Sequence, residues 1–140
     1  PLKGIFTCYS CGSGVCGEYK KRKLLNGGHR DHIYYHCTRS RNPRCKEGFI
    51  TERALIREIL DKVDEISEDQ LIISNSMQPI LNEYEKIITE AKYLADYGFD
   101  GTLTTKDYIH YIVRQGSLRA RKETIGALPI PKRLHRRELL

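Results

Sequence analysis

The sequence predicts a small α+β fold in which a β-hairpin carrying four cysteines comes first, an α-helical hairpin follows, and a further helix lies near the C-terminus. Two observations support this prediction. Four of the 5 cysteines form two spaced pairs near the N-terminus, and from residue 51 onward apolar residues recur at steps of three and four, as on one face of a helix. A chain of 140 residues has room for one domain or two small ones.

The four cysteines have the spacing of a metal site. Cys8 and Cys11 enclose two residues and are followed by Gly12, which lets the backbone turn beneath the pair, and Cys37 and Cys45 form the second pair. Four thiolates suit Zn²⁺, which accepts soft ligands in a tetrahedron and has no redox chemistry. Because four protein ligands leave no position for a substrate or an activated water, the pattern predicts one structural Zn²⁺ and argues against a metalloenzyme.

Other uses of these residues fit less well. Disulfides are disfavoured because the number of cysteines is odd and all of them lie before residue 46, so a reducing cytoplasm is expected. Cys16 is the spare cysteine and suits a small strand position. His36 competes with Cys37 as a ligand, but neighbouring strand residues point to opposite faces. His29 and His32 are further metal ligands in principle.

Short strands are expected at residues 15–23 and 32–37. Asn26, Gly27 and Gly28 tolerate positive φ and suit the hairpin turn between them. The inward positions of these strands are expected to be Val15, Tyr19, Ile33 and Tyr35. The segment from residue 38 to 46 is an enlarged knuckle between the last two cysteines.

Two helices are expected after the hairpin, at residues 51–73 and 79–97. Thr51 suits the N-cap of the first, and its apolar stripe begins with Ile56 and Ile59. Pro79 costs about 3 kcal/mol inside a helix but almost nothing at a helix start, which favours two helices folded back on each other. One long kinked helix is the alternative.

A third helix is expected to begin after Thr104 or Thr105 and to run toward Arg114, and then to continue through Lys122 after an irregularity at Gly116-Ser117. Two prolines, at 129 and 131, end helix formation. Nothing in the basic tail at residues 132–137 requires order. No apolar run approaches the roughly 20 residues of a membrane span, and no signal peptide opens the chain.

Charge divides the chain into three segments. Residues 1–50, the ribbon, have ten Lys or Arg against three Asp or Glu; residues 51–101, the helical hairpin, have five against twelve; residues 102–140, the basic helix and tail, have nine against three. Both ends therefore suit a polyanion such as DNA, and the middle would be repelled by one. Acidic residues of the middle segment fall mostly opposite its apolar stripe, so a solvated face explains them, and no catalytic constellation is present.

The best candidate DNA-binding residues are the cations that the hairpin and the second knuckle bring together. A solvated basic face is the alternative explanation. Their position on a metal-held hairpin favours contacts to phosphates. The candidates are Lys20, Lys21, Arg22, Lys23, Arg30, Arg39, Arg41 and Arg44.

Several motifs together resemble the recombinase zinc ribbon of large serine site-specific recombinases, which include phage integrases and transposon recombinases. The resemblance covers residues 1 to about 60, with Phe6 where leucine is usual. The motifs are the Cys-x-x-Cys-Gly opening, Tyr35-His36-Cys37, Arg44-Cys45-Lys46, and Ile50-Thr51-Glu52 at the start of a helix. In that family the following helix leads into a coiled-coil excursion, and residues 56–97 are similar in kind.

The resemblance implies a C-terminal, DNA-binding part of a recombinase that recognises one half of an attachment site, with the four matched cysteines as zinc ligands. The family's catalytic serine lies in a domain that this sequence lacks, so the chain is expected to be non-catalytic. Other recombinase subunits would bind the helical hairpin, and a small directionality protein is a further candidate partner. The source would be a bacterium, a phage or a mobile element.

A protein-interaction module held together by zinc is the rival interpretation. Charge reversal at Arg39, Arg41 and Arg44 separates the two, because it should abolish DNA binding and leave helix-mediated association intact.

Overall fold

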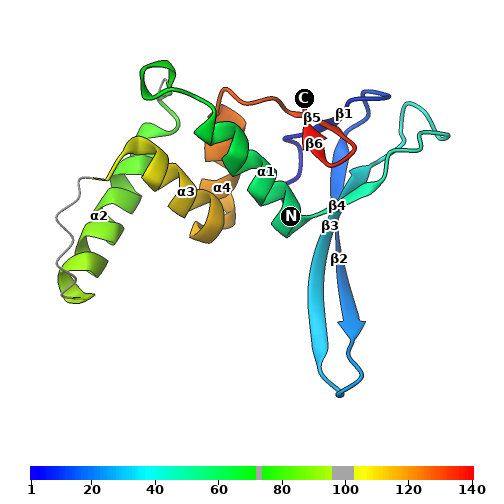
Figure 1. Cartoon of the computed structure of the whole chain (residues 1–140), viewed down its shortest axis with the longest axis horizontal. Helices are drawn as coiled ribbons and strands as arrows, with labels where there is room; N and C mark the ends of the chain where they lie inside the picture. Colours follow the sequence, from blue (N-terminus) through cyan, green and yellow to red (C-terminus); the bar gives the residue numbers. More distant parts are fainter. Residues whose placement is uncertain (72–73, 96–102) are drawn as a thin grey trace. The chain divides into compact units, whose positions relative to one another are not determined.

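The computed structural model describes residues 1–71, 74–95 and 103–140 (Figure 1). The chain divides into two units: the ribbon unit, Pro1–Lys62 with Ile130–Leu140, and the helical unit, Val63–Pro129. These bounds differ from those of the three segments set by charge. The predicted α+β class, with a cysteine-bearing hairpin followed by helices, is confirmed.

The ribbon unit is built on the expected hairpin. Strand β2 (Val15–Lys23) pairs antiparallel with β3 (His29–Cys37), which in turn pairs with the short β4 (Phe49–Thr51). The turn lies where it was predicted, and Gly27 has a φ of +83°, which a side chain would disfavour. The second strand begins three residues earlier than expected because the ladder continues to the pair Lys23–His29.

Only the base of this hairpin has a buried face. Val15 and Tyr35 are buried as predicted, together with Ile50 of β4. The prediction that Tyr19 points inward is wrong, since its side chain is 58 % exposed. The reason is that β4 pairs only with residues 34–36, so the hairpin continues beyond it as a two-stranded arm (Figure 1).

The C-terminal tail is ordered, contrary to expectation. Strand β5 (Arg133–His135) pairs in parallel with β1 (Thr7–Cys8), and β6 (Glu138–Leu139) folds back on β5. Leu134 and Leu139 are buried. Two short strands with one buried residue each have too little local pattern to be recognised. The order of β5 comes from its pairing with β1, more than a hundred positions away, and β6 in turn pairs with β5.

Helix α1 (Glu52–Asp64) starts where it was expected, with Thr51 Oγ1 accepting the N–H of Ala54 at 3.2 Å. Ile59 and Val63 of the proposed apolar stripe are buried, but Leu55 takes the buried position before them in place of Ile56. The prediction that this helix reaches residue 73 is wrong. After Asp64 the chain turns into a 3-10 helix, η1 (Glu68–Gln70), preceded by Ser67 in extended conformation.

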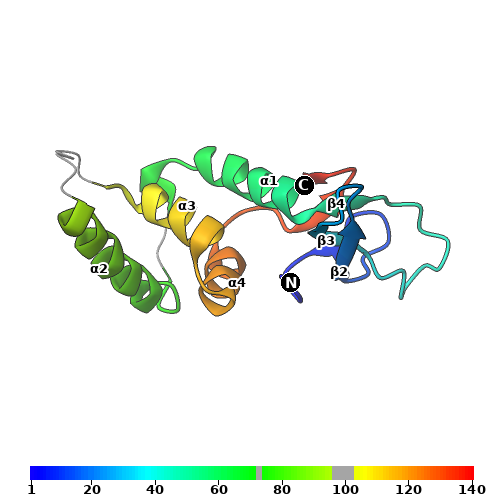
Figure 2. The ribbon, with the colours of Figure 1, turned by 90° about the horizontal axis from the view of Figure 1, so that it is seen from below.

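In the helical unit, α2 (Gln78–Ala95) has Pro79 in its first turn, as predicted. It contacts α3 (Thr105–Gln115), which contacts α4 (Leu118–Ala127), and the two views agree on this order (Figure 1 and Figure 2). The Tyr84 hydroxyl accepts the N–H of Ser117 at 2.9 Å, so it joins α2 to the start of α4. Pairing between the two helices expected at 51–73 and 79–97 stays a prediction.

The third expected helix is two helices. Of the two threonines proposed as its cap, Thr104 caps α3, through a capping box with Asp107. The irregularity expected at Gly116-Ser117 is a complete break: α3 ends there with Gly116 in extended conformation, and Ser117 caps a new helix that contains Lys122. No helix within the described ranges is long and apolar enough to cross a membrane.

Candidate metal centre and basic groove

The four cysteines of the predicted site meet at one end of the ribbon unit. Their sulfur atoms all lie within 4.8 Å of one another, and three of the four side chains are buried, while Cys11 is half-buried. Cys8 Sγ lies 3.8 Å from Cys45 Sγ, and Cys11 Sγ lies 3.4 Å from Cys37 Sγ. No other cluster of at least three metal-ligating side chains occurs among the described residues.

These distances fit a tetrahedral ion with sulfur ligands. Zn–S bonds of about 2.3 Å place the corners of a tetrahedron about 3.8 Å apart, close to both observed separations. The four cysteines are therefore close enough together to bind one metal ion.

Each of the two knuckles contains a residue with a left-handed backbone. Gly12 has a φ of +72° directly after the first pair, and Arg39 has a φ of +58° two residues after Cys37. The N–H of Arg39 donates to Cys37 Sγ at 3.2 Å. Such N–H donors stabilise thiolates and fix the direction of the sulfur lone pairs.

Ser13 connects the two knuckles, and sequence reasoning did not find it. Its Oγ, in a side chain that is 1 % exposed, accepts the N–H of Arg41 at 2.9 Å and lies 3.0 Å from Cys11 Sγ. The protonated Cys11 thiol donates to Ser13 Oγ, and once the thiol ionises the hydroxyl can turn its own proton toward the thiolate. This hydrogen bond, with that of the Ser13 backbone, lowers the pKa of Cys11 to about 6.

The buried thiols behave in the opposite way. Burial raises the pKa of Cys37 to about 12 and also raises the pKa of Cys8. A cation at the centre of the four sulfurs would reverse this, because a coordinating thiol is deprotonated outright.

Cys16 and His36 lie outside the cluster. Cys16 Sγ is 3.5 Å from His36 Nε2, and His36 Nδ1 is 2.9 Å from the carbonyl oxygen of Cys37. His36 therefore points away from the sulfur cluster, as strand alternation predicted.

Glu47 joins the metal loops to the C-terminal tail. Its carboxylate accepts from the Ser10 hydroxyl, contacts His135 Nδ1 at 2.6 Å, and accepts the N–H of Arg136 at 3.2 Å. These bonds, the one from Ser10 first, hold the pKa of the Glu47 carboxyl below its usual range. Sequence spacing could not reveal the residue, because its partners lie 37 to 89 positions away.

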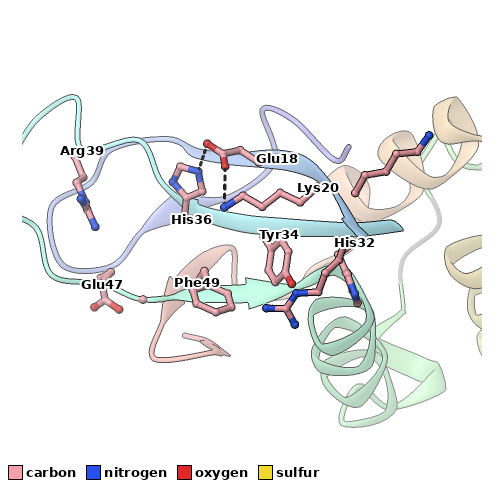
Figure 3. A pocket seen from close by; sticks show the side chains of 11 residues that line it. Glu18, Lys20, His32, Tyr34, His36, Arg39, Glu47 and Phe49 are labelled. Carbon is pink, nitrogen blue, oxygen red and sulfur yellow. Dashed lines mark ion pairs between the residues drawn. The ribbon is translucent and has the colours of Figure 1, made fainter. Parts of the chain in front are cut away.

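The exposed face of the three-stranded sheet carries a groove of about 460 Å³ next to this carboxylate (Figure 3). Lys20 Nζ lies 5.8 Å from the centre of the Tyr34 ring, and Tyr34 packs edge-on against Phe49 at 5.2 Å. Two acids, Glu18 and Glu47, line the groove, and Glu18 pairs with Lys20 at 3.9 Å and with His36 at 3.1 Å. The groove thus combines cations with the half-buried ring of Tyr34 and the exposed ring of Phe49. Its lining consists of Glu18, Lys20, Lys21, Arg22, His32, Tyr34, His36, Arg39, Glu47, Gly48 and Phe49.

The structure separates the candidate DNA-binding residues between the two faces of the hairpin. Strand alternation places Lys20 and Arg22 on the groove face and directs Lys21 and Lys23 to the other, although Lys21 also lines the groove. Arg22 lies directly opposite Arg30 in the ladder. Like charges in that position repel each other and destabilise the pair.

The second knuckle contributes one arginine to the groove. Arg39 lines it, whereas Arg41 reaches over the first knuckle, where a Cβ on Gly12 would come within 3.3 Å of Arg41 Nη1. Arg44 is exposed beside Cys45.

A comparison with protein families matches residues 1–64 to the recombinase zinc beta ribbon domain. The sequence resemblance to that ribbon is therefore confirmed for this part of the chain. Neither the curated proteins nor the solved structures contain a match to the chain.

Proposed function

We propose that this chain is a zinc-stabilised segment of a serine site-specific recombinase that binds double-stranded DNA. It would recognise one half of an attachment site and supply no catalytic group itself. One observation carries the proposal: the exposed face of a sheet in a recombinase ribbon collects cations and aromatic rings in one groove.

Zinc is the ion that this donor set favours. Four thiolates in a tetrahedron suit a soft, redox-inert cation, and a full set of protein ligands leaves no open coordination position. The role of Cys8, Cys11, Cys37 and Cys45 is then to hold the two knuckles together. The bound metal supplies folding free energy to a unit with a small core.

The groove face suits DNA better than it suits a protein surface. Lys20 and Arg22 alternate along one strand and face His32 and Arg30 of its partner. Repulsion within such a row costs stability in the free protein, and a phosphate backbone removes that cost when it binds. The two-stranded arm would then lie with its groove face against the DNA backbone.

The test is selection of bound fragments from a random duplex pool by the zinc-loaded chain near 0.15 M salt. Enrichment of one motif is expected, because an attachment site must be distinguished from bulk DNA. Absence of enrichment, with binding that only fades as salt rises, would show generic attraction of a basic protein and contradict the proposal.

A pair of charge reversals locates the surface. Lys20→Glu changes the groove face, whereas Lys23→Glu makes the same change of charge three residues later on the other face. We expect Lys20→Glu to weaken binding and to reduce the slope of log K against log salt by about 1 or more, and Lys23→Glu to bind nearly as wild type. Equal losses in both variants would mean that the attraction is not confined to the groove.

Contacts to other recombinase subunits, and to a small directionality protein, form the second part of the proposal. The exposed Ile87 of α2 and Leu118 of α4 are apolar side chains in the helical unit that a protein partner could cover. Ile87→Glu should leave DNA binding by the ribbon unit unchanged and weaken association between DNA-bound copies. Sedimentation of the complex measures this, and unchanged association would exclude α2 as the contact.

A further inference from the structure

The turn between β5 and β6 has a backbone conformation that its residues do not favour. Arg136 has a φ of +46° and Arg137 a φ of +69°. They connect the paired residues His135 and Glu138, so they form a two-residue hairpin turn with both central residues left-handed. Such turns favour Asn-Gly, because a Cβ is costly at positive φ.

This conformation is held by contacts to the ribbon. Glu47 accepts the N–H of Arg136 at 3.2 Å and contacts His135 at 2.6 Å, so one carboxylate fixes both the strand end and the turn. The side chains of Arg136 and Arg137 are exposed. Residues kept in costly conformations by their surroundings tend to occur at functional sites.

The turn also borders the groove. The Arg137 guanidinium lies 5.9 Å from the centre of the Phe49 ring, and a second hollow is lined by Gly48, Phe49, Arg136 and Arg137. Gly48 and Phe49 line the main groove as well (Figure 3). A continuous row of rings, His32, Tyr34 and Phe49, therefore leads from the hairpin to the two arginines.

We infer that the Arg136–Arg137 turn is a second phosphate-contact element, which extends the DNA-binding face of the ribbon unit to its C-terminal end. The inference rests on the proposed function. The groove cations would contact the phosphates along the hairpin, and the two guanidinium groups would contact phosphates beyond Phe49. Arginine suits this role because its planar fork matches a phosphate group.

A double substitution separates binding from folding. Arg136→Asn with Arg137→Gly creates the sequence that the turn prefers, and it removes both guanidinium groups. Its thermal stability should equal or exceed that of wild type. Its Kd for duplex DNA at 0.15 M salt should rise about 10- to 100-fold, and the salt slope should fall by about 2, since two contacts to charged groups are lost.

The matched control is Arg53→Gln with Arg57→Gln, which removes two exposed positive charges from α1 outside the groove. It should bind nearly as wild type. One outcome refutes the inference alone: wild type binds DNA, Lys20→Glu weakens that binding, and the turn variant binds like wild type with an unchanged salt slope. The proposed function then stands. If wild type itself does not bind duplex DNA, the proposed function fails and the inference fails with it. Equal losses in the turn variant and the α1 control would also refute the inference, because net charge alone would then explain them.

Discussion

The ordered C-terminal tail leads to a sharp prediction about two adjacent leucines. Leu139 is 0 % exposed, whereas Leu140 is 46 % exposed. The backbone N–H of Leu139 donates to Glu58 at 3.1 Å and that of Leu140 to Arg133 at 2.8 Å, and both bonds survive replacement by alanine. The variants Leu139→Ala and Leu140→Ala therefore differ mainly in the burial of the removed atoms.

Burial determines the expected difference in stability. Replacing a core leucine with alanine costs about 2–5 kcal/mol, through lost transfer free energy and the cavity that remains. A substitution at an exposed position changes the free energy of unfolding by about 0.5 kcal/mol or less. In a unit of this size, each kcal/mol shifts the Tm by about 4–8 °C, so Leu139→Ala should lower it by roughly 8–40 °C.

The assay is thermal unfolding of the zinc-loaded chain, followed by circular dichroism and by zinc release to a coloured chelator. In Leu139→Ala, the temperature at which zinc is released should fall together with the Tm, because metal binding and folding of the ribbon unit are linked. If both variants melt and release zinc like wild type, the tail does not support the metal-bearing unit and the reasoning is refuted.

Three further predictions concern the metal, its pH dependence and two glycines. Cys11→Ser should reduce the bound zinc well below one equivalent per chain and destabilise the ribbon unit, whereas Cys16→Ser should keep one zinc per chain, as measured by elemental analysis. Equal zinc content in the two variants would show that Cys11 is not a ligand. Zinc affinity should rise between pH 6 and pH 8, by about tenfold per pH unit for each proton that zinc displaces. The reason is that burial raises the pKa of Cys37 to about 12, so its thiol proton must leave when zinc binds. A competition titration in which the zinc affinity does not change with pH would contradict this prediction. Gly116→Ala should destabilise the helical unit by about 1–3 kcal/mol, because the new Cβ would lie 2.5 Å from the Ile112 carbonyl oxygen. Gly126→Ala should stabilise the same unit by about 0.5–1 kcal/mol, because Gly126 lies in α4 and its new Cβ would have nothing within 4 Å. Urea unfolding measures both free energies, and changes of the same sign in the two variants would contradict this explanation.

Local patterns predicted the parts of the fold whose causes are local. The spacing of the cysteines predicted their cluster, and the Asn-Gly-Gly sequence predicted the hairpin turn. Thr51 and Thr104 cap their helices as expected, because a cap depends on residues three positions away. These features need no knowledge of the rest of the chain.

Features that depend on distant contacts were missed. Glu47 has partners on the first knuckle and in the tail, and Ser13 bonds to a residue 28 positions away. The tail has no glycine or asparagine in its turn, so nothing local indicates a hairpin there. Tyr19 was placed inward from alternation alone, but alternation cannot say where a sheet ends.

The parallel pairing of β1 with β5 makes the helical unit an insertion within the ribbon unit, since the chain leaves the ribbon after Lys62 and returns at Ile130. The entropic cost of closing such an excursion grows only with the logarithm of its length, so a doubling adds about 0.6 kcal/mol. An insertion of quite different size could thus replace the present one at little thermodynamic cost to the metal-bearing part. The architecture allows the two parts to be exchanged and lengthened independently, as interchangeable modules on one chain.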